Sequence, residues 1–291
     1  MDYLRGNATA SATGLFVICR HLAEYPKGRK DDELRRALQL LRGGSGEADE
    51  GGAMLTATLA VGDGLSVLSK DSSTSTWTVE ESVAELTRGS EGSWVAFRGE
   101  LLRRIVSQGV TSASNDGKTP DLVLGLTWFM QQNPLRPVAV DWTSGPEPLV
   151  TELGFEAVAR SEQWRPFVRW AIALGLARRS ESSTPKVVIP DASTAIGDQL
   201  AALPKSASAH AWLASLRERL PILGASSLTD RLPQGRDWDQ VPPAVVLGLL
   251  KLEKMGALVL EPSDDASDIV SIGLGEEHRQ IGRVKVGGGH D

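Results

Sequence analysis

The stretch Gly175-Leu176-Ala177-Arg178-Arg179 decides the fold, because it joins a glycine that ends a helix to a strand-like run. Two further stretches have the same form: Gly64-Leu65-Ser66-Val67-Leu68 and Gly256-Ala257-Leu258-Val259-Leu260. Each is followed by small polar residues, which favour turns, and then by a second β-rich run. These second runs are Trp77–Val79, Val187–Ile189 and Ile269–Ile272.

A helix that is closed by glycine and followed at once by a hairpin is how a winged-helix unit ends. Three such endings at nearly constant spacing, each after a pair of helices, indicate a tandem array. We therefore expect a mainly α fold with small β-hairpins, in which winged-helix modules are joined by a helical bridge. Such a fold is typical of nucleic-acid binding or of protein scaffolding.

The expected order of modules follows from this pattern. An N-terminal winged-helix module (residues 1–82) precedes a helical bridge (83–147), a central winged-helix module (148–204) and a C-terminal winged-helix module with a flexible tail (205–291). Proline-rich segments at Asn133–Pro137 and Gly145–Pro148 punctuate the bridge, because proline removes a backbone donor and fixes φ. The glycine-rich, acidic segment Gly43–Gly52 is expected to be an exposed loop.

Composition limits the ways in which the chain could bind nucleic acid. The net charge is −6 and the sequence pI is near 5.4, which argues against a basic coat over the whole surface. The single cysteine, Cys19, lies in an apolar helical run and is expected to be a buried structural thiol. No signal peptide or membrane span is evident, so we expect a cytoplasmic, bacterial protein.

A local basic cluster in the central module is the best candidate for DNA contact, because base edges and phosphates need hydrogen-bond donors. From Arg160 to Lys186 the chain holds six Lys or Arg and two Asp or Glu, a net charge of +4. Two of the cations are one turn apart on the third helix of the module, and three lie in its hairpin. The candidate nucleic-acid-binding residues are Arg165, Arg169, Arg178, Arg179 and Lys186. The alternative is a structural or partner-binding role for this cluster.

The other two modules are weaker candidates. In the N-terminal module the third helix, Met54–Ala60, has no basic residue, and the net charge of +3 between Arg20 and Arg42 is explained equally well by a solvated helix face. In the C-terminal module the loop of the hairpin is acidic and would repel phosphate. Its acidic residues are Asp264, Asp265 and Asp268. This module is expected to be a partner surface or a structural unit.

Sequence signatures of enzymes are absent. The chain has no Gly-x-x-x-x-Gly-Lys-Ser/Thr loop, and Gly62-Asp63-Gly64 lacks both the remaining glycine of a phosphate-binding loop and a following helix of the right kind. Four scattered histidines and one cysteine give no metal-ligand spacing. We therefore expect no catalysis, no metal, no cofactor and no small-molecule substrate.

Several short motifs resemble a known family. They are Leu126-Thr127-Trp128-Phe129-Met130-Gln131-Gln132-Asn133-Pro134, Trp142, Leu174-Gly175-Leu176-Ala177, Val188-Ile189-Pro190-Asp191, Leu249-Leu250-Lys251-Leu252-Glu253 and Gly256. They are similar to DpdG-type proteins over about Leu122 to Leu260. These are accessory proteins encoded with bacterial clusters that insert 7-deazaguanine derivatives into DNA and restrict foreign DNA. The resemblance implies a non-catalytic role in phage defence or DNA processing, and it supplies no binding residues.

Several functions fit these observations. The first is an interaction subunit that docks on other subunits of a defence or DNA-processing complex, with double-stranded DNA as a candidate second partner and no membrane. The alternative is a sequence-specific DNA-binding transcriptional regulator, which only the basic cluster favours. A subunit of a chromosome-organising complex and an enzyme of unknown mechanism remain open. A regulator should bind a defined duplex by itself with strong salt dependence, whereas a scaffold should bind weakly and co-purify with its neighbours.

Overall fold

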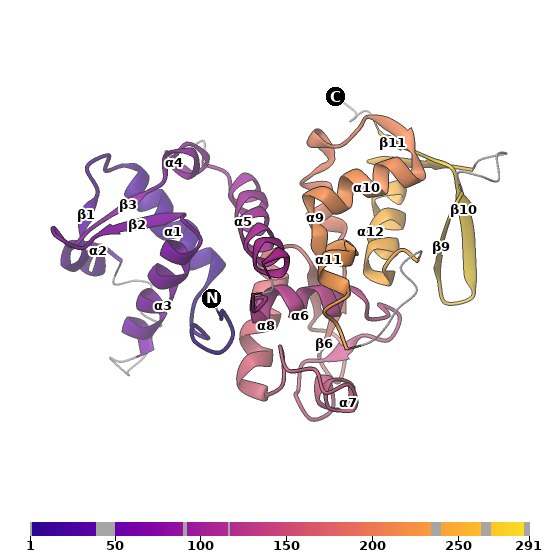
Figure 1. Ribbon diagram of the computed structural model, residues 1–291, viewed down its shortest axis with the longest axis horizontal. Coiled ribbons are helices and arrows are strands. Elements are labelled where there is room, and N and C mark those ends of the chain that lie inside the picture. The colour runs from indigo at the N-terminus through magenta and orange to yellow at the C-terminus, as the bar shows by residue number, and fades with distance from the viewer. Residues whose placement is uncertain are drawn as a thin grey trace. The chain divides into compact units, whose positions relative to one another are not determined.

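A computed structural model of the protein describes residues 2–38, 50–89, 92–115, 117–233, 240–262 and 269–287. It is mainly helical with small antiparallel sheets, as expected (Figure 1). The chain divides into two compact units, Met1–Ile105 and Val106–Asp291. The long helix α5 (Trp94–Ser114) spans the division.

The first unit is built around one three-stranded sheet. Its elements are α1 (Ala12–Ala23), β1 (Arg29–Lys30), α2 (Asp31–Ala37), α3 (Glu50–Gly64), β2 (Leu68–Asp71), β3 (Thr76–Val79), α4 (Glu81–Thr87) and the first half of α5. The sheet has the order β1-β3-β2, with Leu68 opposite Val79 and Arg29 opposite Trp77. The predicted hairpin between the runs at Leu68 and Val79 is therefore present.

Helix α2 begins with three acidic residues, Asp31 to Glu33, and carboxylates in a first turn interact favourably with the helix dipole. Asp31 also fixes this end of the helix to the sheet. The indole Nε1–H of Trp77 on β3 donates to Asp31 Oδ1 at 2.8 Å, and Arg35 Nε donates to Oδ2 at 2.6 Å. Residues 43–49 of the predicted loop lie outside the described residues. The prediction was wrong for Glu50–Gly52, which form the first turn of α3.

Cys19 is buried in the inner face of α1, together with Leu15, Ile18 and Leu22. Burial raises the pKa of its thiol, and the charge of Arg104 offsets this only in part. The thiol is therefore a small apolar core group, as predicted, rather than a nucleophile.

The second unit contains two three-stranded sheets and a separate hairpin. Its elements are α6 (Asp121–Met130), β4 (Val138–Ala139), α7 (Pro146–Glu152), α8 (Ser161–Ala173), β5 (Ala177–Ser180), β6 (Val187–Pro190), α9 (Ser193–Gly197), a 3-10 turn (Leu200–Ala202), β7 (Ser206–Ser208), α10 (Ala209–Arg219), a 3-10 turn (Pro221–Leu223), α11 (Ser226–Thr229), α12 (Pro243–Lys254), β8 (Leu258–Glu261), β9 (Val270–Leu274), β10 (Glu277–Ile281) and β11 (Arg283–Val286). The sheet orders are β4-β6-β5 and β7-β11-β8.

The three sheets share one strand order, in which the last strand lies between the other two. In each sheet, the strand that comes first in the chain (β1, β4 or β7) is only two or three residues long and lies at one edge. Strand β4 lies within the segment predicted as a helical bridge, and it pairs with β6 through Val138 opposite Val188. A first strand that completes the sheet was not predicted for any module.

The predicted third hairpin was wrong in its pairing. Strand β8 pairs with β11, with Leu260 opposite Val284, whereas β9 pairs with β10 in a hairpin of its own that lies beside α12 (Figure 1). The β9–β10 turn is Gly275-Glu276, and Gly275 has φ of 67°. Two-residue hairpin turns favour a glycine with positive φ, so β9 finds its partner in the next strand. The acidic loop predicted for this hairpin, at residues 263–268, lies outside the described residues.

Two of the three glycines that define the sequence pattern have left-handed backbone. Gly175 and Gly256 follow the C-caps of α8 and α12 with φ of 75° and 74°. In the first unit this differs, because Gly64 is the last residue of α3 and Ser66 takes the positive φ, 54°. Glycine adopts this conformation at little cost, so it ends both helices sharply.

The two glycines should respond differently to alanine. A Cβ at Gly256 meets no atom within 4 Å, so Gly256→Ala should cost about 1 kcal/mol of stability through the left-handed backbone alone. A Cβ at Gly175 would lie 2.9 Å from Thr194 Cγ2 on α9, so Gly175→Ala should cost roughly 1 kcal/mol more. Urea unfolding of both variants measures the difference. Equal losses would contradict the close approach of α9 to this turn.

Candidate nucleic-acid interface

Helix α8 presents two of the predicted arginines on the surface because its other face is anchored in the core. Trp164 and Phe167 are buried and stack with ring centroids 5.3 Å apart, and the ring of Phe129 on α6 meets both of them edge-on. The helix begins at Ser161, where Gln163 Oε1 accepts from the N–H of Ala159 at 2.8 Å. These contacts fix the rotation of α8 about its axis.

Arg165 and Arg169 are therefore exposed one turn apart on the same side of α8. Arg165 makes no hydrogen bond or ion pair within the described part of the chain. Partial desolvation lowers the pKa of Arg169 from its usual value, but arginine remains charged at neutral pH. Both guanidinium groups are thus cations at the surface of this helix.

Arg178 and Arg179 do not form one patch. They are consecutive residues of β5, and successive side chains of a strand point to opposite faces. Arg178 Nη1 lies 4.0 Å from Oδ2 of the buried Asp191. Arg179 Nε instead pairs with Glu181 at 2.6 Å.

Lys186 lies on the Arg179 side of the hairpin. Its Nζ is 3.1 Å from Glu181 Oε2, so Arg179 and Lys186 share one carboxylate. A shared carboxylate offsets part of their charge, and exposed pairs of this kind contribute little to stability. These two cations are therefore less available to a phosphate than Arg165, which forms no ion pair within the described residues.

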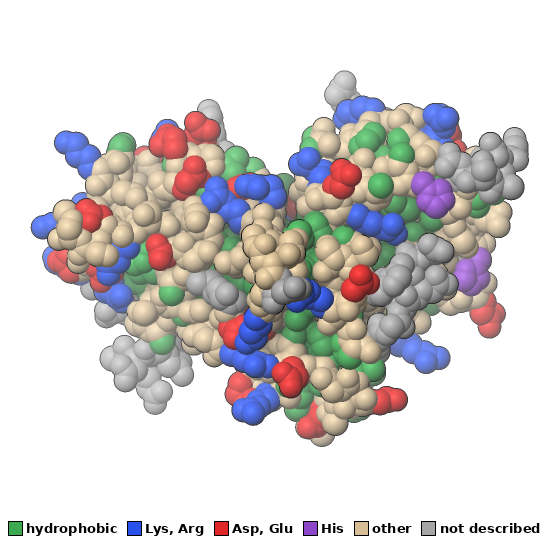
Figure 2. All heavy atoms as spheres, viewed as in Figure 1, with side chains coloured by type: hydrophobic (Ala, Val, Ile, Leu, Met, Phe, Trp, Pro, Cys, Tyr) green, Lys and Arg blue, Asp and Glu red, His purple; other side chains and the backbone are tan. Residues whose placement is uncertain are grey.

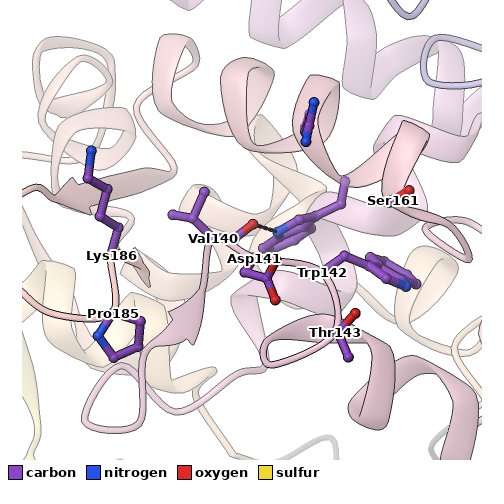
Figure 3. Close-up of a pocket in the computed structure, with 9 residues that line it drawn as sticks. Val140, Asp141, Trp142, Thr143, Ser161, Pro185 and Lys186 are labelled. Carbon is purple, nitrogen blue, oxygen red and sulfur yellow. Dashed lines mark hydrogen bonds between the residues drawn. The ribbon is translucent and has the colours of Figure 1, made fainter.

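The structure brings Arg165 and Lys186 together at one surface hollow of about 520 Å³. The hollow lies where the loop after β4, the start of α8 and the start of β6 meet (Figure 3). Its walls are formed by Val140, Asp141, Trp142, Thr143, Ser161, Trp164, Arg165, Pro185 and Lys186. Figure 3 places Trp142 and Lys186 on opposite sides of Asp141.

Backbone contacts hold the loop after β4 in place. The N–H of Val140 donates to the carbonyl of Lys186 at 2.9 Å, and the Nε1–H of Trp164 donates to the carbonyl of Val140 at 2.9 Å (Figure 3). At the end of the loop, a Cβ on Gly145 would lie 2.3 Å from the carbonyl oxygen of Ala139. Only glycine fits there, so the loop closes tightly against β4.

Asp141 adds one carboxylate to the hollow. Its Oδ1 accepts from the N–H and Oγ–H of Ser144 at 3.1 and 3.0 Å. These hydrogen bonds lower the pKa of Asp141, and the nearby charge of Arg165 lowers it further. The hollow therefore combines two cations, an ionised carboxylate, two hydroxyl groups and two indole rings, of which only that of Trp142 is half-exposed.

Of these groups, sequence reasoning identified only the two cations as site residues. Trp142 entered only through the family resemblance, and Asp141, Thr143 and Ser161 were not singled out. The available signal was Asp141-Trp142-Thr143-Ser144-Gly145, a turn sequence that carries a tryptophan between two proline-rich segments. An aromatic side chain in such a turn covers little of the core, so it is a candidate binding group.

Comparison with protein families adds to this geometry. The family model described as DpdG-like matches residues 4–266. The chain belongs to the DpdG-like family. Membership confirms the resemblance and indicates an accessory protein of a DNA-modification cluster. No curated protein and no solved structure matches the chain.

The described part of this DpdG-like chain contains no group of three or more His, Cys, Asp or Glu side chains placed to hold a metal ion. Among its helices, none combines the length and apolar character that a membrane span requires. On the face shown in Figure 2, basic and acidic side chains are interspersed over both units.

Proposed function

We propose that this protein is a non-catalytic, cytoplasmic winged-helix subunit of a bacterial phage-defence or DNA-processing complex. It docks protein partners and contacts double-stranded DNA through α8 and the β5–β6 hairpin. Support for the winged-helix modules comes from the strand order, which is the same in β1-β3-β2, β4-β6-β5 and β7-β11-β8. In the first two sheets, the last strands form a hairpin directly after a helix.

The observation that carries DNA contact is the outward face of α8. This helix occupies the third-helix position, which winged-helix proteins place in the major groove. Arg165 and Arg169 provide donors on that face, and Lys186, which directly precedes β6, lines the same hollow as Arg165. Phosphate contacts by such cations release counterions, so the binding should weaken steeply with salt.

Scaffolding by the third module is favoured by its surface. Helix α12 occupies the same position before β8 as α8 does before β5, but its first half is apolar and largely buried. Met255 and Val259 follow it with 73% and 45% of their surface exposed. Single exposed apolar side chains are common on protein surfaces, so we assign partner docking to this module because the first half of α12 has no cation to meet a phosphate.

Replacing Arg165 and Arg169 together by alanine should weaken duplex binding, and the slope of log K against log salt should fall by about 0.9 per lost phosphate contact. Fluorescence anisotropy with a labelled duplex at several salt concentrations measures both quantities. Lys254→Ala, on the corresponding helix α12, is the matched control and should change neither. A double variant with the affinity and slope of the unmodified protein would exclude α8 as the DNA contact.

The hairpin arginines give a second comparison. Arg178→Ala with Arg179→Ala should have a smaller effect than the α8 pair, because both hairpin arginines lie near carboxylates.

A regulator would bind one defined duplex strongly by itself, whereas the proposed subunit should bind weakly and co-purify with proteins encoded beside it. Tight, sequence-specific binding by the isolated chain would favour the regulator.

A further inference from the structure

Trp142 differs from the other described tryptophans. Trp77, Trp128, Trp164, Trp170 and Trp212 are buried, and the half-exposed Trp94 packs against Phe16 and Phe97. Trp142 is also half-exposed, but within the described residues its ring makes no aromatic contact and its Nε1–H makes no hydrogen bond. An uncommitted indole in the wall of a hollow is a stacking surface.

The other walls of the hollow suit the remaining parts of a nucleotide. Arg165 and Lys186 are cations that suit a phosphate. Thr143 and Ser161 supply hydroxyl groups that can either donate or accept. At about 520 Å³, the hollow is larger than a phosphate ion needs and lies within the range of small-ligand sites.

Asp141 indicates which bases would be accepted. Its Oδ1 accepts hydrogen bonds from the N–H and Oγ–H of Ser144, and the backbone N–H of Thr143 also stabilises the charged form of the carboxylate. An ionised carboxylate only accepts, so it favours a base edge with an amino group and repels one with a carbonyl oxygen. Cytosine offers its N4 amino group where thymine has O4.

We infer that the hollow binds one unpaired nucleotide of a DNA strand, with its base stacked on Trp142 and its phosphate held by Arg165 and Lys186. A base inside a duplex is stacked on both sides and cannot reach Trp142 in this loop. Single-stranded DNA offers such a base without the cost of unpairing. The inference rests on the proposed DNA contact, and it adds a strand-specific site beside the duplex surface of α8.

The test compares single strands with duplexes. Fluorescein-labelled dC12, dT12 and a mixed-sequence duplex are titrated with the full chain. We expect dC12 to bind more tightly than dT12, and Trp142→Ala to weaken dC12 binding about 10-fold, because stacking on an aromatic residue contributes about 1–3 kcal/mol per base. Duplex affinity should be unchanged, and Trp142→Phe should retain most of the strand affinity.

Two further variants separate the roles within the hollow. Arg165→Ala should lower both the dC12 affinity and its salt slope, whereas Trp142→Ala should lower the affinity alone, because an uncharged ring releases no counterion. Asp141→Asn should reduce the preference for dC12 over dT12. Thermal unfolding of each variant confirms that the fold is retained.

The outcomes separate this inference from the proposed function. Equal losses of strand and duplex binding in Trp142→Ala, or no loss of either, would overturn the nucleotide site while leaving duplex contact by α8 intact. Loss of strand binding alone supports it, even if the duplex proves not to bind. The last measurement is the affinity for free dCMP. If dCMP bound as tightly as dC12, the hollow would be a site for a free nucleotide, and the inference that it binds a DNA strand would be overturned.

Discussion

Replacing Lys251 by methionine is expected to lower the free energy of unfolding of the unit Val106–Asp291 by about 3 kcal/mol. Lys251 on α12 donates from Nζ to Asp191 Oδ2 at 2.5 Å and to Ser193 Oγ at 2.9 Å. The side chain of Asp191 is only 2% exposed, so methionine would leave this buried carboxylate with only the N–H of Ser193, at 2.9 Å, and the more distant Arg178 to offset its charge. Urea unfolding followed by tryptophan fluorescence measures the loss.

Two comparisons identify the cause of this loss. Lys254→Met removes an exposed lysine from the same helix and should change stability by less than about 0.5 kcal/mol. Adding Asp191→Asn to Lys251→Met should restore part of the lost stability, because the buried charge is then gone. If the double variant had a lower free energy of unfolding than Lys251→Met alone, the unpaired charge of Asp191 would not be the cause of the loss.

This ion pair also bears on the function of the hairpin. It joins α12 to Asp191, the residue directly after β6. Arg178 approaches the same Asp191 oxygen at 4.0 Å, so its guanidinium is partly committed to this junction. We therefore expect Arg178 to contribute less to DNA binding than Arg165, although both were selected by the same sequence argument.

Local sequence patterns predicted those parts of the fold that local chemistry determines. The β2–β3 and β5–β6 hairpins follow from polar turns between adjacent β-rich runs, and helix α2 follows from its acidic first turn. The partner of β8 could not be predicted in this way. It is β11, and the whole β9–β10 hairpin lies between the two strands in the chain.

The candidate site was also predicted only where local sequence determines it. Arg165 and Arg169 were predicted on one helix face, because helical spacing is a property of the sequence. The opposite directions of Arg178 and Arg179 were also available from the alternation of a strand, but the prediction grouped them by charge. The hollow was not predictable, because two hydrogen bonds bring the loop after β4 to its other walls: the N–H of Val140 donates to Lys186, and the Nε1–H of Trp164 on α8 donates to Val140. Both bonds join residues that are far apart in the sequence.

In the first unit, Arg104→Ala is expected to cost about 3 kcal/mol, because hydrogen bonds to charged groups contribute about 1.5–3 kcal/mol each. The guanidinium is 15% exposed and lies between α5 and the turn before β2. It donates to the carbonyl of Ser66 at 2.6 Å and to Glu100 Oε1 at 2.6 Å, and a third bond reaches Glu80 at 3.0 Å. Urea unfolding of the unit Met1–Ile105 measures the loss.

Arg103 provides the matched control for this variant. It also pairs with Glu100, at 2.6 Å, but its side chain is 56% exposed and, within the described residues, it makes no hydrogen bond to the turn. Arg103→Ala should therefore cost less than about 1 kcal/mol. Arg104→Lys should recover little of the loss, because one ammonium group cannot reproduce the planar fork that reaches three partners at once. A lysine variant as stable as the unmodified protein would show that charge alone is required.

The same arginine should shape the response of this unit to acid. Burial alone would raise the pKa of Glu100, but hydrogen bonds from Arg103 and Arg104 outweigh it and hold the pKa below its usual 4.5. A carboxylate whose pKa is lowered by folding stabilises the folded state above its unfolded value, and this stabilisation is lost as the pH falls through the folded value. Unfolding free energies measured from pH 6 down to about pH 3 should therefore fall less steeply in Arg104→Ala than in the unmodified protein. Parallel curves would mean that Arg103 alone sets the pKa of Glu100, and that Arg104 acts through the carbonyl groups of the turn.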